Sequence, residues 1–118
     1  MNKYEAASVI EEILPEAHIF EKNGRLSFDI NRTVTCLTDF LKKKWLMHDM
    51  ASVKKTLSLA EVIYRKGDAA VRSSIENILV FSLSAMMPND KWQRKDLQVN
   101  IPVTLYQLFV HQIMHSNI

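Results

Sequence analysis

Apolar residues recur at three- and four-residue intervals along most of the chain, the spacing that places them on one face of an α-helix. Proline and capping residues mark the ends of several such segments. The pattern predicts a mainly α fold, a small antiparallel bundle of four to five helices. The predicted helices run from Lys3 to Leu14, from the cap Asp29 to Leu46, from Ala51 to the turn at Gly67, from Ala69 to Met87 and from Pro102 to His115.

Asn23 and Gly24 interrupt this helical pattern between two short segments that contain apolar residues. Asn-Gly favours a tight β-hairpin, because both residues tolerate the positive φ of a type I′ turn. The strands would be Ile19 to Lys22 and Arg25 to Phe28. An extended loop fits equally well, since two strands alone are only marginally stable. The sequence therefore leaves a short β-hairpin and a loop as alternatives.

Two turns flank the fourth predicted helix. Gly67 is expected to end the helix before it in the left-handed conformation, and Asp68 to cap the helix that follows. Pro88 ends that helix. The segment from Asn89 to Asn100 is expected to be a polar connection with room for one short helical turn.

The longest apolar run, Ile75 to Met87, contains one charged residue. It is shorter than the roughly 20 residues that span a bilayer, so no membrane segment is expected. A helix that is apolar over most of its circumference is buried by its neighbours, which predicts a central helix of the bundle. A helical projection gathers the polar residues in a narrow sector with two apolar residues beside it: Ser73, Asn77 and Ser84, flanked by Val80 and Phe81.

Glu76 is the charged residue in that run. Because buried carboxylates are usually paired, we expect it at the edge of the buried face or paired with a basic residue such as Arg72. The functional alternative is a buried polar site made by Tyr64, Glu76 and Asn77.

Composition limits the remaining choices. The 118 residues fit a single helical domain spanning residues 1–118, and the net charge of +2 is too small to imply a polyanionic partner. The lone Cys36 suits a reducing compartment, and early glutamates are unlike a signal peptide. A cytoplasmic location is therefore expected.

Few catalytic patterns fit the chain. With glycine only at positions 24 and 67, phosphate-binding loops and dinucleotide fingerprints are excluded. His111 and His115 are four residues apart and could share a metal, but no third ligand is signalled. No histidine is placed beside Cys36, which we expect to be a semi-buried apolar residue near Phe40. We expect no catalytic residues, no cofactor and no metal.

Two clusters combine basic residues with a tryptophan: Lys42, Lys43, Lys44 and Trp45, and Trp92, Arg94 and Lys95. Such clusters can contact phosphates and stack on bases. Alternatively, the lysines interact with the end of the helix dipole while Trp45 packs inward. Both clusters are candidate surfaces for a protein or a nucleic acid.

The segment Leu59 to Ser84, LAEVIYRKGDAAVRSSIENILVFSLS, resembles a segment of uncharacterised small bacterial helical proteins. Families of this kind are similar to the immunity and accessory proteins of bacterial toxin systems. The resemblance implies a cytoplasmic domain that acts by binding another protein, and it implies no catalytic residues.

The sequence thus predicts a non-enzymatic protein-binding module, immunity-like or regulatory, in a bacterial cytoplasm. The alternative is a nucleic-acid-associated helical module that uses Lys42 to Lys44 together with Arg94 and Lys95. An enzyme with a pocket around Glu76 and Tyr64 is a third alternative. Surplus apolar surface would also suit a homodimer.

Overall fold

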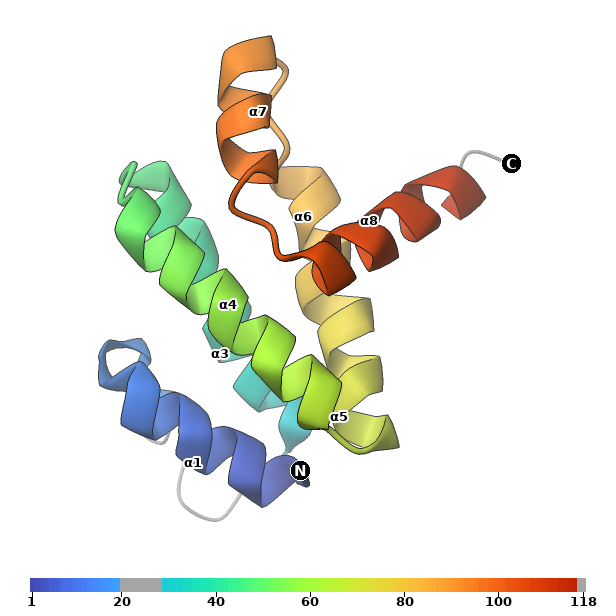
Figure 1. The fold of residues 1–118 in the computed structure, drawn as a ribbon. Coiled ribbons are helices and arrows are strands. Elements are labelled where there is room, and N and C mark those ends of the chain that lie inside the picture. The colour runs from blue at the N-terminus through green and yellow to red at the C-terminus, as the bar shows by residue number, and fades with distance from the viewer. Residues whose placement is uncertain (20–28, 117–118) are drawn as a thin grey trace.

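The regular structure is helical throughout the part of the chain described by the computed structural model, residues 1–19 and 29–116, with side chains up to Met114 (Figure 1). No strand occurs among these residues. The elements, in chain order, are α1 (Lys3–Ile13), the 3₁₀ turn η1 (Pro15–Ala17), α3 (Ile30–Leu46), α4 (Met50–Lys66), α5 (Ala69–Ser74), the π-helical segment η2 (Ile75–Val80), α6 (Phe81–Met86), α7 (Lys91–Gln98) and α8 (Val103–Ser116).

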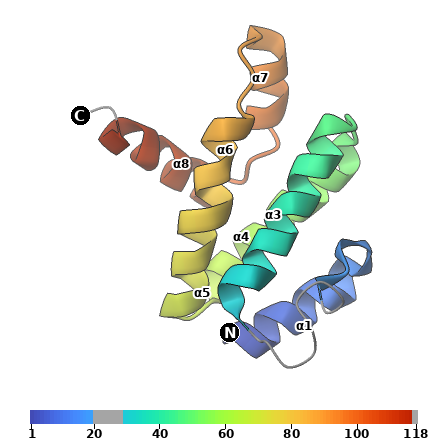
Figure 2. The ribbon, with the colours of Figure 1, turned by 180° about the vertical axis from the view of Figure 1, so that it is seen from behind.

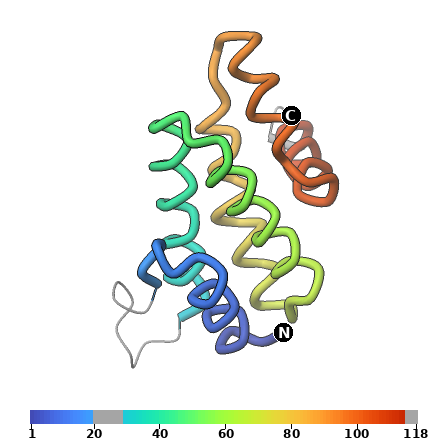
Figure 3. Tube along the Cα trace, turned by 60° about the vertical axis from the view of Figure 1, so that its left-hand side comes forward, coloured from blue at the N-terminus to red at the C-terminus, as the bar shows by residue number. Residues whose placement is uncertain are grey.

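Three long helices make the centre of the molecule: α3, α4 and the continuous helix formed by α5, η2 and α6. Helices α3 and α4 are antiparallel neighbours, and the continuous helix packs along them (Figures 1 and 2). Helix α1 crosses one end of this group. Helix α8 lies against α6 and η2, away from α1 (Figure 3). The predicted mainly helical fold is confirmed.

The hydrophobic core joins buried side chains from every helix. Cys36 is buried, as is its sequence neighbour Leu37, so it is more enclosed than the semi-buried position that was expected. The largest fully buried side chains are Ile10, Leu14, Ile19, Leu37, Leu41, Leu57, Ile63, Ile75, Leu79, Leu83, Leu97 and Leu105. Burial of each such side chain contributes about 2 kcal/mol before the entropy of ordering is subtracted.

In five of the described helices, the residue directly before the helix caps its N-terminus with a side-chain oxygen. Each accepts hydrogen bonds from backbone N–H groups that the first helical turn leaves without partners. The capping residues are Asn2 for α1, Asp29 for α3, Asp49 for α4, Asp68 for α5 and Asp90 for α7. The predicted caps at Asp29 and Asp68 are thereby confirmed.

The central helix departs from the regular α-helix that its sequence predicts. Residues Ile75–Val80 form a π-helical segment, whose wider turns are closed by i→i+5 hydrogen bonds. Because a π-helical turn contains more residues, successive side chains are separated by a smaller angle around the helix axis. As a result Val80 is fully buried whereas its neighbour Phe81 is 65% exposed, although the α-helical projection placed both beside the polar sector.

Gly67 does not adopt the left-handed conformation that was predicted. Its φ of −73° and ψ of 152° are extended values open to any residue. Close approach explains the glycine instead, because a Cβ here would lie 2.7 Å from the carbonyl oxygen of Ile63 and 2.6 Å from Cγ1 of Val71. The turn therefore needs glycine for space.

Two other predictions concern the connecting segments. The hairpin proposed around Asn23 and Gly24 lies outside the described residues, while Ile19, placed at its start, is helical and fully buried. The connection after Pro88 holds the eight-residue helix α7, longer than the single turn expected. Asp90 at its start and the buried Leu97 near its end account for that helix.

Within the described residues, no helix combines the length and the apolar character needed to cross a membrane.

Candidate binding surfaces

Tyr64, in the last turn of α4, and Glu76, in η2, form a polar contact between these two helices. The buried Tyr64 hydroxyl of α4 donates a 2.7 Å hydrogen bond to Oε1 of the half-buried Glu76 in η2. The guanidinium carbon of Arg72 lies 5.0 Å from the centroid of the Tyr64 ring, a cation–π distance. The partner of Glu76 is thus Tyr64, and Arg72 covers the ring of that tyrosine.

Asn77, the third member of the predicted polar site, lies elsewhere. Its side chain is exposed, and its amide Nδ2 donates to Oγ of Ser73 at 3.2 Å. The structure therefore brings Tyr64 and Glu76 together and leaves Asn77 on the outer face. A tyrosine bound to one carboxylate joins two helices, a structural use of both groups.

Two polar contacts hold α8 against the bundle. Glu61 of α4 accepts a 2.9 Å hydrogen bond from the backbone N–H of Thr104, in the first turn of α8. Gln112 donates a 2.9 Å hydrogen bond to the backbone oxygen of Glu76, within the π-helical segment. The first and third turns of α8 are thus attached to the central helices, and Leu105 and Phe109 are buried.

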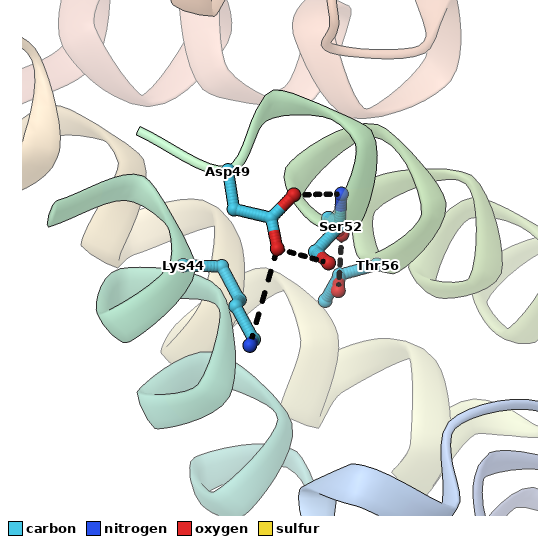
Figure 4. A network of polar contacts seen from close by, with 4 residues as sticks. All are labelled: Lys44, Asp49, Ser52 and Thr56. Atoms are coloured by element: carbon cyan, nitrogen blue, oxygen red, sulfur yellow. Dashed lines mark hydrogen bonds and ion pairs between the residues drawn. The ribbon is translucent and has the colours of Figure 1, made fainter. Parts of the chain in front are cut away.

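The first basic cluster lies at the C-terminal end of α3. Its Lys44 contacts Asp49 in the turn that leads to α4 (Figure 4). Asp49 accepts hydrogen bonds from the backbone N–H of Ser52 at 3.2 Å and from its hydroxyl at 2.8 Å, while Thr56 donates to the Ser52 carbonyl at 2.7 Å. Nζ of Lys44 lies 4.0 Å from Oδ2 of Asp49. These contacts lower the pKa of Asp49, chiefly through the Ser52 hydroxyl, then its N–H, with a smaller contribution from Lys44.

The remaining members of this cluster lie differently. Lys42 is half-buried and Lys43 is exposed, whereas the half-buried Trp45 packs against the core. The inward packing of Trp45 agrees with the dipole interpretation of the lysines.

The residues of the second basic cluster, on α7, also differ in their contacts. Arg94 donates from Nε to the carbonyl of Pro88 at 3.2 Å and from its terminal nitrogen to that of Asn89 at 3.4 Å. It therefore holds the connection before α7. Trp92 is 71% exposed, and Lys95 is exposed on the same short helix.

An apolar groove of about 320 Å³ lies between the C-terminal ends of α3 and α6. We call it the α3–α6 groove. Its lining residues are Lys42, Trp45, Leu46, Ala85 and Met86. Leu46 is 77% exposed although it belongs to a helix with a well-formed core face. The prediction included Lys42 and Trp45 but missed Leu46, Ala85 and Met86, because the groove exists only where two distant segments meet.

A second groove, of about 360 Å³, lies where α7 turns into α8. We call it the α7–α8 groove. Its lining residues are Gln98, Val99, Ile101, Val103, Tyr106 and Gln107. Val99 and Val103 are largely exposed, which gives this corner a surface of apolar side chains. The sequence pattern singles out none of these residues, because the groove forms only where α7 turns into α8.

Among the described residues, no group of three or more histidine, cysteine, aspartate or glutamate side chains is placed to hold a metal ion. His111 is exposed on α8, and the side chain of His115 lies outside the described residues.

Comparison with known proteins adds a family assignment. No curated protein and no solved structure matches the chain. The model of one family, described as a domain of unknown function (DUF7674), matches residues 5–115. That match runs from the first turn of α1 to the last turn of α8, so it includes every element that forms the core and both grooves. The chain therefore belongs to the DUF7674 family of domains of unknown function.

Proposed function

We propose that this protein is a non-enzymatic protein-binding module that holds its partner in the α3–α6 groove. The observation that carries the proposal is the composition of that groove, which Leu46, Ala85 and Met86 line together with Lys42. Exposed apolar side chains beside a few polar groups are typical of binding surfaces. A groove of this size accommodates one large side chain of a partner.

The charges around the groove indicate the chemistry of that partner. Lys42 lines the groove, and Lys43 is exposed next to it in the sequence. Lys44 is directed to Asp49 and does not add to this charge. The surface therefore suits a segment that presents an apolar side chain flanked by a carboxylate.

The use of the acidic residues supports binding rather than catalysis. Asp29, Asp49, Asp68 and Asp90 cap helices. Glu61 holds the N-terminus of α8, and Glu76 accepts the hydrogen bond of Tyr64. Each of these carboxylates stabilises the fold through a hydrogen bond within the protein. A general acid or base would instead need access to a substrate.

The resemblance of the segment Leu59 to Ser84 to immunity and accessory proteins suggests which partner to test. This segment forms the turn at Gly67 and most of the central helix. We extend the proposal accordingly to an immunity-like or regulatory role in a bacterial cytoplasm, with a toxin as the partner. A toxin gene beside the gene for this chain would identify the candidate.

The test is calorimetric titration of this protein with the purified product of that neighbouring gene. We expect binding, and we expect Leu46→Glu to weaken it at least about tenfold, because the new carboxylate occupies the groove and repels an acidic partner. Val62→Glu is the control, since Val62 is also exposed but lies on α4 in another groove. No binding, or equal weakening by both variants, would contradict the proposal.

A DNA oligonucleotide in the same experiment addresses the nucleic-acid alternative. Binding that falls steeply with salt and is lost in the double variant Lys42→Glu and Lys95→Glu would favour it over protein binding. We expect no such binding, because Lys44 and Arg94 already have local contacts.

A further inference from the structure

Helix α8 carries two apolar faces. Leu105 and Phe109 point into the core, and Gln112 on the same side is bonded to the carbonyl of Glu76. A second row of apolar residues, here called the α8 seam, runs along another face: Val103, Tyr106, Val110 and Ile113. Val103 is 72% exposed, Tyr106 and Ile113 are each 37% exposed, and Val110 is partly buried against the core.

The spacing of the α8 seam is that of a coiled coil. Its residues follow one another at intervals of three, four and three, which places them at successive a and d positions of a heptad. Such a row meets the side chains of another helix along its whole length. The α8 seam therefore fits a helix as its partner.

The same spacing makes the seam complementary to itself. Intervals of three, four and three read identically in both directions, so an antiparallel copy of α8 matches every position. With the twofold axis near Leu108, Val103 faces Ile113 of the second copy, and Tyr106 faces its Val110. Each pair of facing residues therefore occurs twice, once on each side of the axis. This is the isologous contact of a twofold dimer.

Charge also favours a second copy. Helix α8 contains no Asp, Glu, Lys or Arg from Val103 to Ser116. Two copies can therefore approach without the like-charge repulsion that opposes self-association of charged helices. An uncharged helix with an apolar seam is matched best by another of the same kind, and this chain carries one.

The α7–α8 groove provides a place for the end of the second helix. In the antiparallel register, Met114 of the second copy lies level with Pro102, next to Val103 and the groove beside it. Met114 is 67% exposed, and its flexible side chain can fill an irregular apolar space.

We propose that two copies of this protein pair through antiparallel α8 helices, with the α8 seam as the contact and Met114 of each copy in the α7–α8 groove of the other. At a rise of 1.5 Å per residue, the paired seam from Val103 to Ile113 is about 15 Å long, which corresponds to a small and reversible interface.

Sedimentation equilibrium tests the pairing between about 10 μM and about 1 mM, because small interfaces dissociate at low concentration. We expect the mass to rise with concentration towards twice the chain mass of 13.7 kDa. Val103→Glu should keep it at one chain mass, since a carboxylate then faces Ile113 in the contact. Leu46→Glu is the control and should associate like the wild type, because Leu46 lies in the α3–α6 groove.

Oxidative crosslinking tests the register. In the double variant Val103→Cys and Ile113→Cys, the two new thiols of one chain lie about 15 Å apart, too far for a disulfide. In the dimer, the thiol at position 103 of one copy faces the thiol at position 113 of the other. We expect a covalent dimer on mild oxidation, and none from Val103→Cys alone. A single chain mass at all concentrations, or association unaffected by Val103→Glu, would overturn the proposal.

Failure of this proposal is separable from failure of the proposed function. The α8 seam and the α3–α6 groove share no residue, so Val103→Glu tests pairing alone and Leu46→Glu tests partner binding alone.

Discussion

The hydroxyl of Tyr64 and the carboxylate of Glu76 are joined by a 2.7 Å hydrogen bond that links α4 to the π-helical segment. The two residues are twelve positions apart, on either side of the turn at Gly67. The bond therefore fixes how the two helices of this antiparallel pair lie along each other.

Replacing Tyr64 by phenylalanine removes that bond and keeps the buried ring. We expect the free energy of unfolding to fall by about 1 kcal/mol, the usual effect of losing one such hydrogen bond. Urea denaturation monitored by circular dichroism measures it. Tyr106→Phe makes the same chemical change on the surface of α8 and should alter stability by less than about 0.5 kcal/mol. Equal effects of the two variants would show that the Tyr64 bond does not stabilise the fold.

Gly67→Ala should destabilise the protein by more than about 1 kcal/mol, because the new methyl group would press on a backbone oxygen as well as on Val71. Thermal unfolding compares it with Ser58→Ala, a change at an exposed position of α4. Alanine in place of a glycine that is not crowded usually stabilises by about 0.4–1 kcal/mol. A gain of that kind would mean that the turn relaxes to admit a side chain.

Asp49 should make stability depend on pH in the acidic range. Its pKa in the folded state lies below its ordinary value of 3.8, so between these two values the unfolded chain binds more protons. The contribution of the charge is complete above about pH 3.8 and is lost as the pH falls through the folded pKa. Asp49→Asn keeps an oxygen for the cap but does not titrate.

Urea midpoints at a series of pH values measure this effect. The advantage of the wild type over Asp49→Asn should shrink as the pH decreases below 3.8. A constant difference across that range would show that the interactions with Ser52 and Lys44 do not depend on the charge.

Much of the helical framework follows from local sequence. Asp29 and Asp68 are short acidic side chains that accept backbone hydrogen bonds, and the apolar spacing behind each is regular. Capping and amphipathic spacing are properties of a few neighbouring residues. For this reason the ends of α3 and the start of α5 could be predicted closely.

Features that depend on distant segments could not be predicted in the same way. The π-helical segment accepts a hydrogen bond from Gln112, 36 positions later. The sequence suggests Arg72, on the same helix, as a partner of Glu76 and groups Glu76 with Tyr64 only in the functional alternative; the hydrogen bond comes from Tyr64 on the neighbouring helix. The α3–α6 groove was missed for the same reason, since Leu46 and Ala85 meet only in the folded chain.

The π-helical segment of the central helix also bears on how the family varies in length. Its wider turns place one residue more between Val71 and Leu83 than a regular α-helix needs to keep both in the core. A relative with an uninterrupted α-helix here should therefore be one residue shorter between its counterparts of Asp68 and Pro88. When family members are compared, such a one-residue gap would distinguish the relatives that lack the π-helical segment from those that have it.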